Sequence, residues 1–410
     1  MKQRSPHSSP AQAPLNRPKK ISILVSDFSQ KSVGRWGGSV RTFILAEALE
    51  SLGYDVELVG VNFGGDYPAL EAMKQRWSLK VVPGSRYPSF FKAAWQILNH
   101  IDGDIIYAHK LKPSSFGIAL LQKWFKSKPV ILDIDDWEMS WHKGDDFRYR
   151  VRPMKLLRDL FGKDGWLQDP NHPLYLSWTE KLVSHATQVT VNTEALQQRF
   201  GGTLVPSGKD MSAFDPAQQD GEAARAHYGL SNYKVLMFPG APRAYKGVED
   251  ILEAMKILGW DDLRLVIVGG SPYDRYDQEL QKTWGESYLI QLPKQPPEKM
   301  PYVVSAAHVV VVPQRDTAAT RAQFPLKLTD GMAMAKPILT TRVGDIPHII
   351  GDAGYIVEPE SPRSLAAALE SIFDDYGAAE ALGHQARKRC LEHFSLVAIA
   401  SHLQSIFKRY

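Results

Sequence analysis

The chain has 410 residues, which is long enough for two domains. Hydrophobic residues make up 44% of the sequence and charged residues 23%, an ordinary balance for a soluble globular protein. The formal net charge of +4 is too small to indicate a nucleic-acid partner.

Cysteine content and hydropathy bear on the compartment. Cys390 is the single cysteine, so no disulfide can form within the chain, which fits a reducing environment. It is interpreted as a packing residue in a helix. No apolar run approaches the ~20 residues of a membrane-spanning helix. Residues 1–19 are rich in proline, serine and basic side chains, so they are interpreted as a disordered tail rather than a secretory signal. The sequence therefore predicts a cytoplasmic protein.

Strands and helices alternate in the first half of the chain, 20–210. The hydrophobic pattern predicts strands at 21–25, 56–59, 79–82, 105–108, 129–132, 188–191 and 203–206, and helices at 39–52, 90–99, 114–125, 174–184 and 193–200. A strand–helix–strand opening predicts a parallel sheet. The stretch 140–173 is irregular and rich in aromatic residues and arginine.

A second alternating set follows a linker at 210–221. The predicted strands are 234–238, 263–268, 289–292, 308–312 and 338–340, and the predicted helices are 247–258, 276–284, 326–335, 361–373, 378–393 and 398–410, with a loop and short helix at 296–306. The domain prediction is thus 20–210, 211–393 and a terminal helix at 394–410. Ligands of doubly wound sheets bind beyond the carboxyl ends of the strands, so a cleft between two such α/β domains is the expected site.

The stretch 324–350 contains the first candidate site. Pro325 suits the first turn of a helix, whose free N–H groups near Leu326 and Lys327 and positive dipole end can hold phosphate. Asp330 lies about one turn further in, where a carboxylate could accept ribose hydroxyls. The alternative is that this apolar helix and the strand after it are simply core, although a buried acid is costly unless it is paired or faces a cleft.

Two cations follow the first strand of the second domain. Arg243 and Lys246 lie just before the predicted helix at 247–258, where positive groups suit a diphosphate. A solvated basic loop is the alternative. In the first domain, Gly37 and Gly38 lie between the first strand and the first helix, where glycine lets backbone approach a ligand closely. A flexible loop explains them equally well.

Polar residues also end two strands of the first domain. His109 follows one strand, and Asp133, Asp135 and Asp136 end the next. A polar group at a strand end points into the cleft, and a carboxylate there could stabilise an oxocarbenium-like centre. Asp135 is the preferred candidate over Asp136, although the sequence leaves the choice open. A lone histidine is more often a satisfied structural residue, and Arg41 is interpreted either as a ligand or as a salt-bridge residue.

These segments resemble retaining glycosyltransferases of the GT-B fold, in the family 4-like group, with two Rossmann-like domains facing across a cleft. Asp330-Gly331-Met332-Ala333 and the residues up to Pro337 match the second acid of the donor motif and the positions after that acid, and Lys246 matches the lysine of the phosphate loop. The motif's first acid, which in the family touches the donor sugar, is replaced by Ala322, beside Gln323. Asp135 takes the place of a residue near the reacting sugar.

The resemblance implies transfer of a sugar from a nucleotide-sugar donor to an acceptor hydroxyl, without a metal or other cofactor. Arg243, Lys246 and the amides near Leu326 and Lys327 would hold the diphosphate, Asp330 the ribose, and Gly37 and Gly38 would close over the phosphate side. Asp135 and His109 would face the reacting centre. A nucleotide-sugar 2-epimerase and an inactive sugar-nucleotide-binding protein are the alternatives, the latter suggested by Ala322 and by Asp330 in place of the motif's second glutamate.

A basic and aromatic stretch at 141–166 suggests a further partner. Cations alternate there with aromatic and leucine side chains, which suits an anionic bilayer surface at the inner membrane face. A solvated insertion and an acceptor-site wall are the other interpretations.

Overall fold

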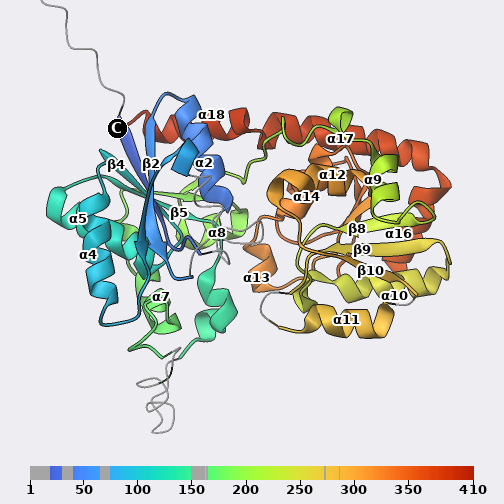
Figure 1. Cartoon of the computed structure of the whole chain (residues 1–410), viewed down its shortest axis with the longest axis horizontal. Coiled ribbons are helices and arrows are strands. Elements are labelled where there is room, and N and C mark those ends of the chain that lie inside the picture. Colours follow the sequence, from blue (N-terminus) through green and yellow to red (C-terminus); the bar gives the residue numbers. More distant parts are fainter. Residues whose placement is uncertain are drawn as a thin grey trace, which may run out of the picture.

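The computed structural model describes residues 19–29, 40–64, 74–148, 162, 165–271, 274–285 and 287–410. Figure 1 shows two α/β lobes side by side, with a red helix running from the second lobe over the first. Each lobe is built on one parallel sheet with helices on both faces. The predicted fold, two Rossmann-like domains, is confirmed.

The sheet of the first lobe has the strand order β3-β2-β1-β4-β5-β6-β7, and all its pairs are parallel. Its strands are β1 (Lys20–Val25), β2 (Asp55–Asn62), β3 (Ser78–Pro83), β4 (Ile105–His109), β5 (Val130–Ile134), β6 (Gln188–Val191) and β7 (Thr203–Leu204). Val25 pairs with His109, and His109 pairs with Asp133. The polar residues that end β4 and β5 are therefore neighbours at the carboxyl edge.

Helices cover both faces of this sheet, as a buried parallel sheet requires. They are α2 (Val40–Ser51), α4 (Phe90–His100), α5 (Ile118–Lys126), α7 (Pro173–Glu180) and α8 (Glu194–Phe200). One core cluster joins α2 to the sheet, and another joins α4 and α5 to the opposite face. Short turns of 3₁₀ helix at Glu138–His142 and Gly144–Asp146 follow β5.

The sheet of the second lobe has the order β10-β9-β8-β11-β12-β13, again all parallel. Its strands are β8 (Lys234–Phe238), β9 (Leu263–Val268), β10 (Leu289–Leu292), β11 (Val309–Val312), β12 (Ile338–Thr341) and β13 (Tyr355–Val357). Its helices are α9 (Gly221–His227), α10 (Val248–Leu258), α11 (Tyr276–Trp284), α12 (Met300–Ser305), α13 (Ala318–Arg321), α14 (Leu326–Ala333), α15 (Ile346–Ile350), α16 (Pro362–Asp374) and α17 (Tyr376–Phe394).

The last helix, α18 (Leu396–Phe407), packs on the first lobe although α17 belongs to the second (Figure 1). Ser395 separates the two helices, and its hydroxyl accepts a hydrogen bond from the N–H of Ala398, which caps α18. Leu403, Ile406 and Phe407 are buried in the same cluster as α2. The chain therefore crosses between the lobes twice.

The elements that differ from the sequence prediction are short. The predicted helix at 174–184 ends at Glu180 and continues as a 3₁₀ turn. The pattern gave no helix for α9 or α15 and no strand for β13, because segments of three to seven residues show too little periodicity. Cys390 is buried in α17 as a packing residue, as predicted. Within the described ranges, no helix has the length and hydrophobicity needed to cross a bilayer.

Candidate active site

A cavity of ≈ 760 Å³ lies between the two lobes, at the carboxyl ends of both sheets. The first lobe lines it with Lys110, Asp135, Asp136 and Trp141, among others. The second lobe contributes a wall of cations at the start of α10 and α14, together with Asp330. This is the position at which doubly wound sheets bind ligands. The structure thus brings most of the predicted site residues into one hollow.

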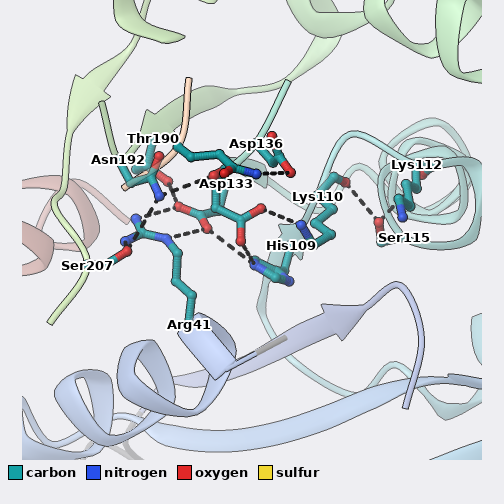
Figure 2. Close-up of polar contacts among 12 residues, drawn as sticks. Arg41, His109, Lys110, Lys112, Ser115, Asp133, Asp136, Thr190, Asn192 and Ser207 are labelled. Carbon is teal, nitrogen blue, oxygen red and sulfur yellow. Dashed lines mark hydrogen bonds and ion pairs between the residues drawn. The ribbon is translucent and has the colours of Figure 1, made fainter. Parts of the chain in front are cut away.

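Arg41 and Asp133 form a buried ion pair in the first lobe (Figure 2). The Arg41 guanidinium donates from Nε and Nη2 to the two oxygens of Asp133, at 2.9 Å each. Arg41 also donates to the carbonyl oxygens of Val205 and Pro206, and Thr190 donates to Asp133 at 2.8 Å. Arg41 therefore forms a salt bridge that ties α2 to β5 and to the chain after β7, and it also lines the cavity.

Asp135 lies on the cavity wall between two basic partners. Lys110 Nζ donates to its Oδ1 at 2.8 Å, and His109 Nε2 lies 3.2 Å from its Oδ2. Although burial opposes ionisation, Lys110 and His109 hold the pKa of Asp135 well below its usual range. The surroundings of Asp135 therefore favour its ionised form.

His109 does not face the cavity, which corrects the expectation that it points at the reacting centre. Its side chain is only 1% exposed, and it lies behind Asp135. A strand residue alternates between the two sides of a sheet, so the last position of β4 need not point into the cleft. Lys110, the next residue, lines the cavity instead. It has a left-handed backbone with φ of 73°, and its N–H donates to the carbonyl of Asp133.

Asp136 faces the second lobe. Its Oδ2 accepts long hydrogen bonds from Trp141 Nε1 at 3.4 Å and from Gln323 Nε2 at 3.5 Å. Its Oδ1 is buried without a hydrogen-bond partner. Burial, with the nearby Glu138 and Asp135 carboxylates, raises the pKa of Asp136 to about 7 despite Lys110. Both candidate aspartates therefore line the cavity, but their surroundings shift their pKa values in opposite directions.

Three cations of the second lobe gather on the opposite wall. Lys246 lies in the turn before α10, Arg243 three residues earlier, and Lys327 in the first turn of α14. Burial and the charges of Lys327 and Arg243 lower the pKa of Lys246 well below its usual value. Arg243 forms an ion pair with the half-exposed Asp274 at 3.2 Å. The concentration of positive charge favours an anion in this part of the cavity.

The start of α14 is less open than its sequence suggests. The N–H of Leu326 donates to the carbonyl of Phe324 at 3.0 Å, and the N–H of Leu328 to that of Pro325 at 2.8 Å. Both Leu326 and Lys327 line the cavity. The N–H of Leu326 is therefore hydrogen-bonded within the loop, whereas the sequence predicted that it would be free to bind phosphate.

Asp330 lines the cavity but also forms an ion pair with Lys209, at the start of the linker. The side chain of Asp330 is 2% exposed. Lys209 additionally lies over the ring of Phe214, 4.4 Å from its centroid. A carboxylate inside an apolar helix needs such a partner to stay charged. The chain thus fixes Asp330 at the cavity edge by a contact between residues 121 positions apart.

The structure does not place every predicted residue in the site. Gly37 and Gly38 lie outside the described residues, as does most of the stretch 141–166. Ala322, at the position of the missing acid, is buried among side chains of the first lobe. Sequence reasoning missed Lys110 and Lys209, although each directly adjoins a predicted strand end or linker. It noted Gln323 only as the neighbour of Ala322.

The arrangement of the two lobes is similar to that of solved glycosyltransferases. HepE from Anabaena, in complex with UDP and glucose, has a TM-score of 0.71 at 15% identity, and the match covers 96% of this chain and 100% of that one. The sucrose-phosphate synthase of Thermosynechococcus elongatus has a TM-score of 0.67 at 18% identity, with 96% of this chain and 99% of that chain covered. The chain therefore has the GT-B fold.

The sequence places the chain in a family. Residues 220–389 match Glycosyl transferases group 1, and residues 37–209 match the Glycosyl transferase 4-like domain. The two matches together span most of the chain, which belongs to the GT-B glycosyltransferases of the family 4-like group.

Curated relatives agree with this family. The D-inositol 3-phosphate glycosyltransferase of Corynebacterium glutamicum is 27% identical over 253 residues, 56% of this chain and 58% of that protein. The match to the enzyme of the same name from Corynebacterium kroppenstedtii, 23% identical, covers 96% of this chain and 90% of that protein. The chain thus aligns with little more than half of the first relative and with nearly all of the second.

Proposed function

We propose that the protein is a retaining glycosyltransferase that moves a sugar from a nucleotide-sugar donor to an acceptor hydroxyl. The interdomain cavity carries this proposal, because one wall holds Arg243, Lys246 and Lys327 and the other holds the carboxylate of Asp135. The leaving nucleoside diphosphate gains negative charge as the glycosidic bond breaks. Fixed cations therefore stabilise the transition state more than the ground state.

The mechanism assigns each side chain a task. Lys246, Arg243 and Lys327 bind the diphosphate, and Asp330, held by Lys209, accepts the ribose hydroxyls. Asp135 stabilises the positive charge that develops on the sugar. The acceptor attacks from the face that the diphosphate leaves, and the departing phosphate oxygen takes the acceptor's proton. That route needs no strong protein base, and the cations serve in place of a metal ion.

Proton uptake tests the role of Lys246. Because the pKa of the free Lys246 ammonium is lowered, a bound diphosphate should raise that pKa again. We expect the protein to take up protons at pH 8 when it binds UDP, GDP or ADP, whichever of these is its ligand. The measurement is isothermal titration calorimetry in two buffers that differ in ionisation enthalpy. Lys246→Met should lose the uptake and weaken binding at least tenfold, whereas Lys299→Met, at an exposed position, should retain both. Equal heats in both buffers for the unmodified chain would contradict this role.

The alternative functions are separated by their products. Incubation with UDP-, GDP- and ADP-sugars should release a nucleoside diphosphate slowly in the absence of an acceptor. A 2-epimerase would alter the sugar while it remains on the nucleotide, and an inactive binding protein would leave it unchanged. Retention is tested by NMR of the product's anomeric configuration, and inversion would exclude the front-face route.

Membrane contact through residues 141–166 is proposed as a separate property. Its basis is the sequence of that stretch, in which cations alternate with aromatic side chains. Replacing Arg150, Arg152 and Arg158 by glutamine should reduce co-sedimentation with anionic liposomes. Unchanged partitioning of the triple variant would exclude this contact.

A further inference from the structure

Asp136 has an unusual hydrogen-bonding state for a residue at the meeting of two domains. Its Oδ1 is buried without a partner, and it is the only carboxylate oxygen in that state within the described part of the chain. Buried polar atoms in native proteins are nearly always hydrogen-bonded, because an unsatisfied one is costly. Asp136 also lines the interdomain cavity. This oxygen therefore has hydrogen-bonding capacity that no described residue uses, and it belongs to a side chain that lines the cavity.

The second oxygen of Asp136 is held only weakly. Its two donors, Trp141 Nε1 and Gln323 Nε2, lie at 3.4 and 3.5 Å, which is the long limit of a hydrogen bond. Trp141 comes from the turn after β5, and Gln323 from the loop before α14. Gln323 itself lines the cavity. A carboxylate and a carboxamide from different lobes thus stand side by side, each with hydrogen-bonding capacity to spare.

The chemistry of this pair suits hydroxyl groups. A carboxylate accepts from an O–H, while an amide can both donate to and accept from one, so together they can bind adjacent hydroxyls. The pair lies close enough to Lys246 for Asp136 and Lys246 to influence each other electrostatically. Asp330, by contrast, is paired with Lys209 at the linker. The two acids therefore line the same cavity but have different partners.

Ala322, the residue before Gln323, cannot bind hydroxyl groups through its side chain. Ala322 has no polar group, and its side chain is buried against the first lobe, in the cluster that contains α4 and α5. Gln323, the next residue, instead contacts a carboxylate of the first lobe, that of Asp136. Because the pair spans both lobes, it is complete only when they are together.

We infer that Asp136 and Gln323 form a two-domain clamp that binds hydroxyls of the transferred sugar, and so select the donor. This inference rests on the proposed function, because it presumes that a nucleotide-sugar occupies the cavity. The clamp should add nothing to the binding of the nucleoside diphosphate alone. It should account for part of the difference in affinity between a nucleotide-sugar and its diphosphate.

Paired substitutions test the clamp on the full chain by calorimetry with UDP, GDP and ADP and with UDP-glucose, GDP-mannose and ADP-glucose. At pH 8, above the pKa of Asp136, we expect Asp136→Asn to weaken binding of the nucleotide-sugar by ~10- to 100-fold, which is the loss of one charged hydrogen bond, and to change binding of the diphosphate less than twofold. Gln323→Ala should show the same selectivity with a smaller loss. The double variant Asp136→Asn with Gln323→Glu moves the carboxylate to the other lobe and should recover most of the lost affinity.

The outcomes distinguish failure of the clamp from failure of the proposed function. Equal weakening of sugar and diphosphate in Asp136→Asn would mean a structural role and overturn the clamp, as would unchanged binding of both. Absence of recovery in the double variant would also overturn it. Failure of the unmodified chain to bind any of the diphosphates would overturn the proposed function and the clamp together. Thermal melting of each variant establishes that it is folded.

Discussion

Asp135 and Asp136 are adjacent in sequence, but their pKa values are shifted in opposite directions because their neighbours differ. Asp135 is held by Lys110 and His109, and its pKa is depressed. Asp136 is half-buried beside Asp135 and Glu138, with Lys110 and Lys246 as the facing cations, and its pKa is raised to about 7. One strand end thus presents a fixed charge and a titrating group to the same cavity.

The raised pKa predicts a stability that depends on pH. Between about pH 4 and 7 the folded state binds more protons at Asp136 than the unfolded state does, so stability decreases as pH rises through that window. Asp136→Asn removes this decrease. We expect the variant to be more stable than the unmodified chain at pH 8, by roughly 1–3 kcal/mol, and equally stable near pH 4. Denaturation at both pH values measures it, with the exposed Glu298→Gln as control. A variant that is less stable at pH 8 would contradict the assignment.

The Arg41–Asp133 pair allows a second test at this scale. Arg41→Ala leaves the Asp133 carboxylate buried without its main partner, which typically costs ~3–5 kcal/mol. Arg321→Ala breaks the exposed pair with Asp316 and should change stability by less than about 1 kcal/mol. Urea denaturation of both variants compares them. Similar losses would show that burial does not decide the contribution of these pairs.

At the scale of elements, glycines at both ends of α10 adopt similar backbone conformations but have different surroundings. Gly247 precedes the helix with φ of 65°, and Gly259 follows it with φ of 63°. A Cβ on Gly247 would collide with the carbonyl oxygen of Pro313, whereas a Cβ on Gly259 would meet open space. The tight approach at Gly247 brings the turn with Lys246 against the end of β11, and so fixes one cation of the cavity wall.

Replacing each of these two glycines by alanine separates the cost of backbone strain from the cost of a steric collision. Gly259→Ala should cost only the ~1–2 kcal/mol of a left-handed alanine. Gly247→Ala should cost more, and should also weaken binding of a nucleoside diphosphate, because the turn with Lys246 must move. Melting temperature and calorimetric affinity report the two effects. Equal losses of stability with unchanged affinity would exclude the close approach as the reason for Gly247.

At the scale of the whole molecule, the α17–α18 connection joins the two cores. Cys390 and Phe394 of α17 are buried in the second lobe, whereas Phe407 of α18 packs against Tyr54 and Tyr107 of the first, with ring centroids 5.8 and 5.3 Å apart. The first lobe therefore completes its core with a helix from the far end of the sequence (Figure 1).

Point substitutions in α18 test that dependence. Phe407→Ala should destabilise the protein by ~3–5 kcal/mol, as for other large buried aromatic residues. Val397→Ala, in the same helix but 77% exposed, should be nearly neutral. Limited proteolysis should show earlier cleavage within the first lobe for Phe407→Ala. A neutral Phe407→Ala would mean that the first lobe is stable without this helix.

The sequence by itself determined the alternation of strands and helices, because hydrophobic periodicity is a local property. It also placed Lys246, Arg243, Asp330 and Asp135 near strand or helix ends, and therefore near one cavity. Only the tertiary structure decided that His109 lies behind Asp135 and that Lys209 holds Asp330. It also brought Gln323 to Asp136, 187 positions away. Such contacts depend on how the two lobes pack together, and no local pattern of residues encodes that packing.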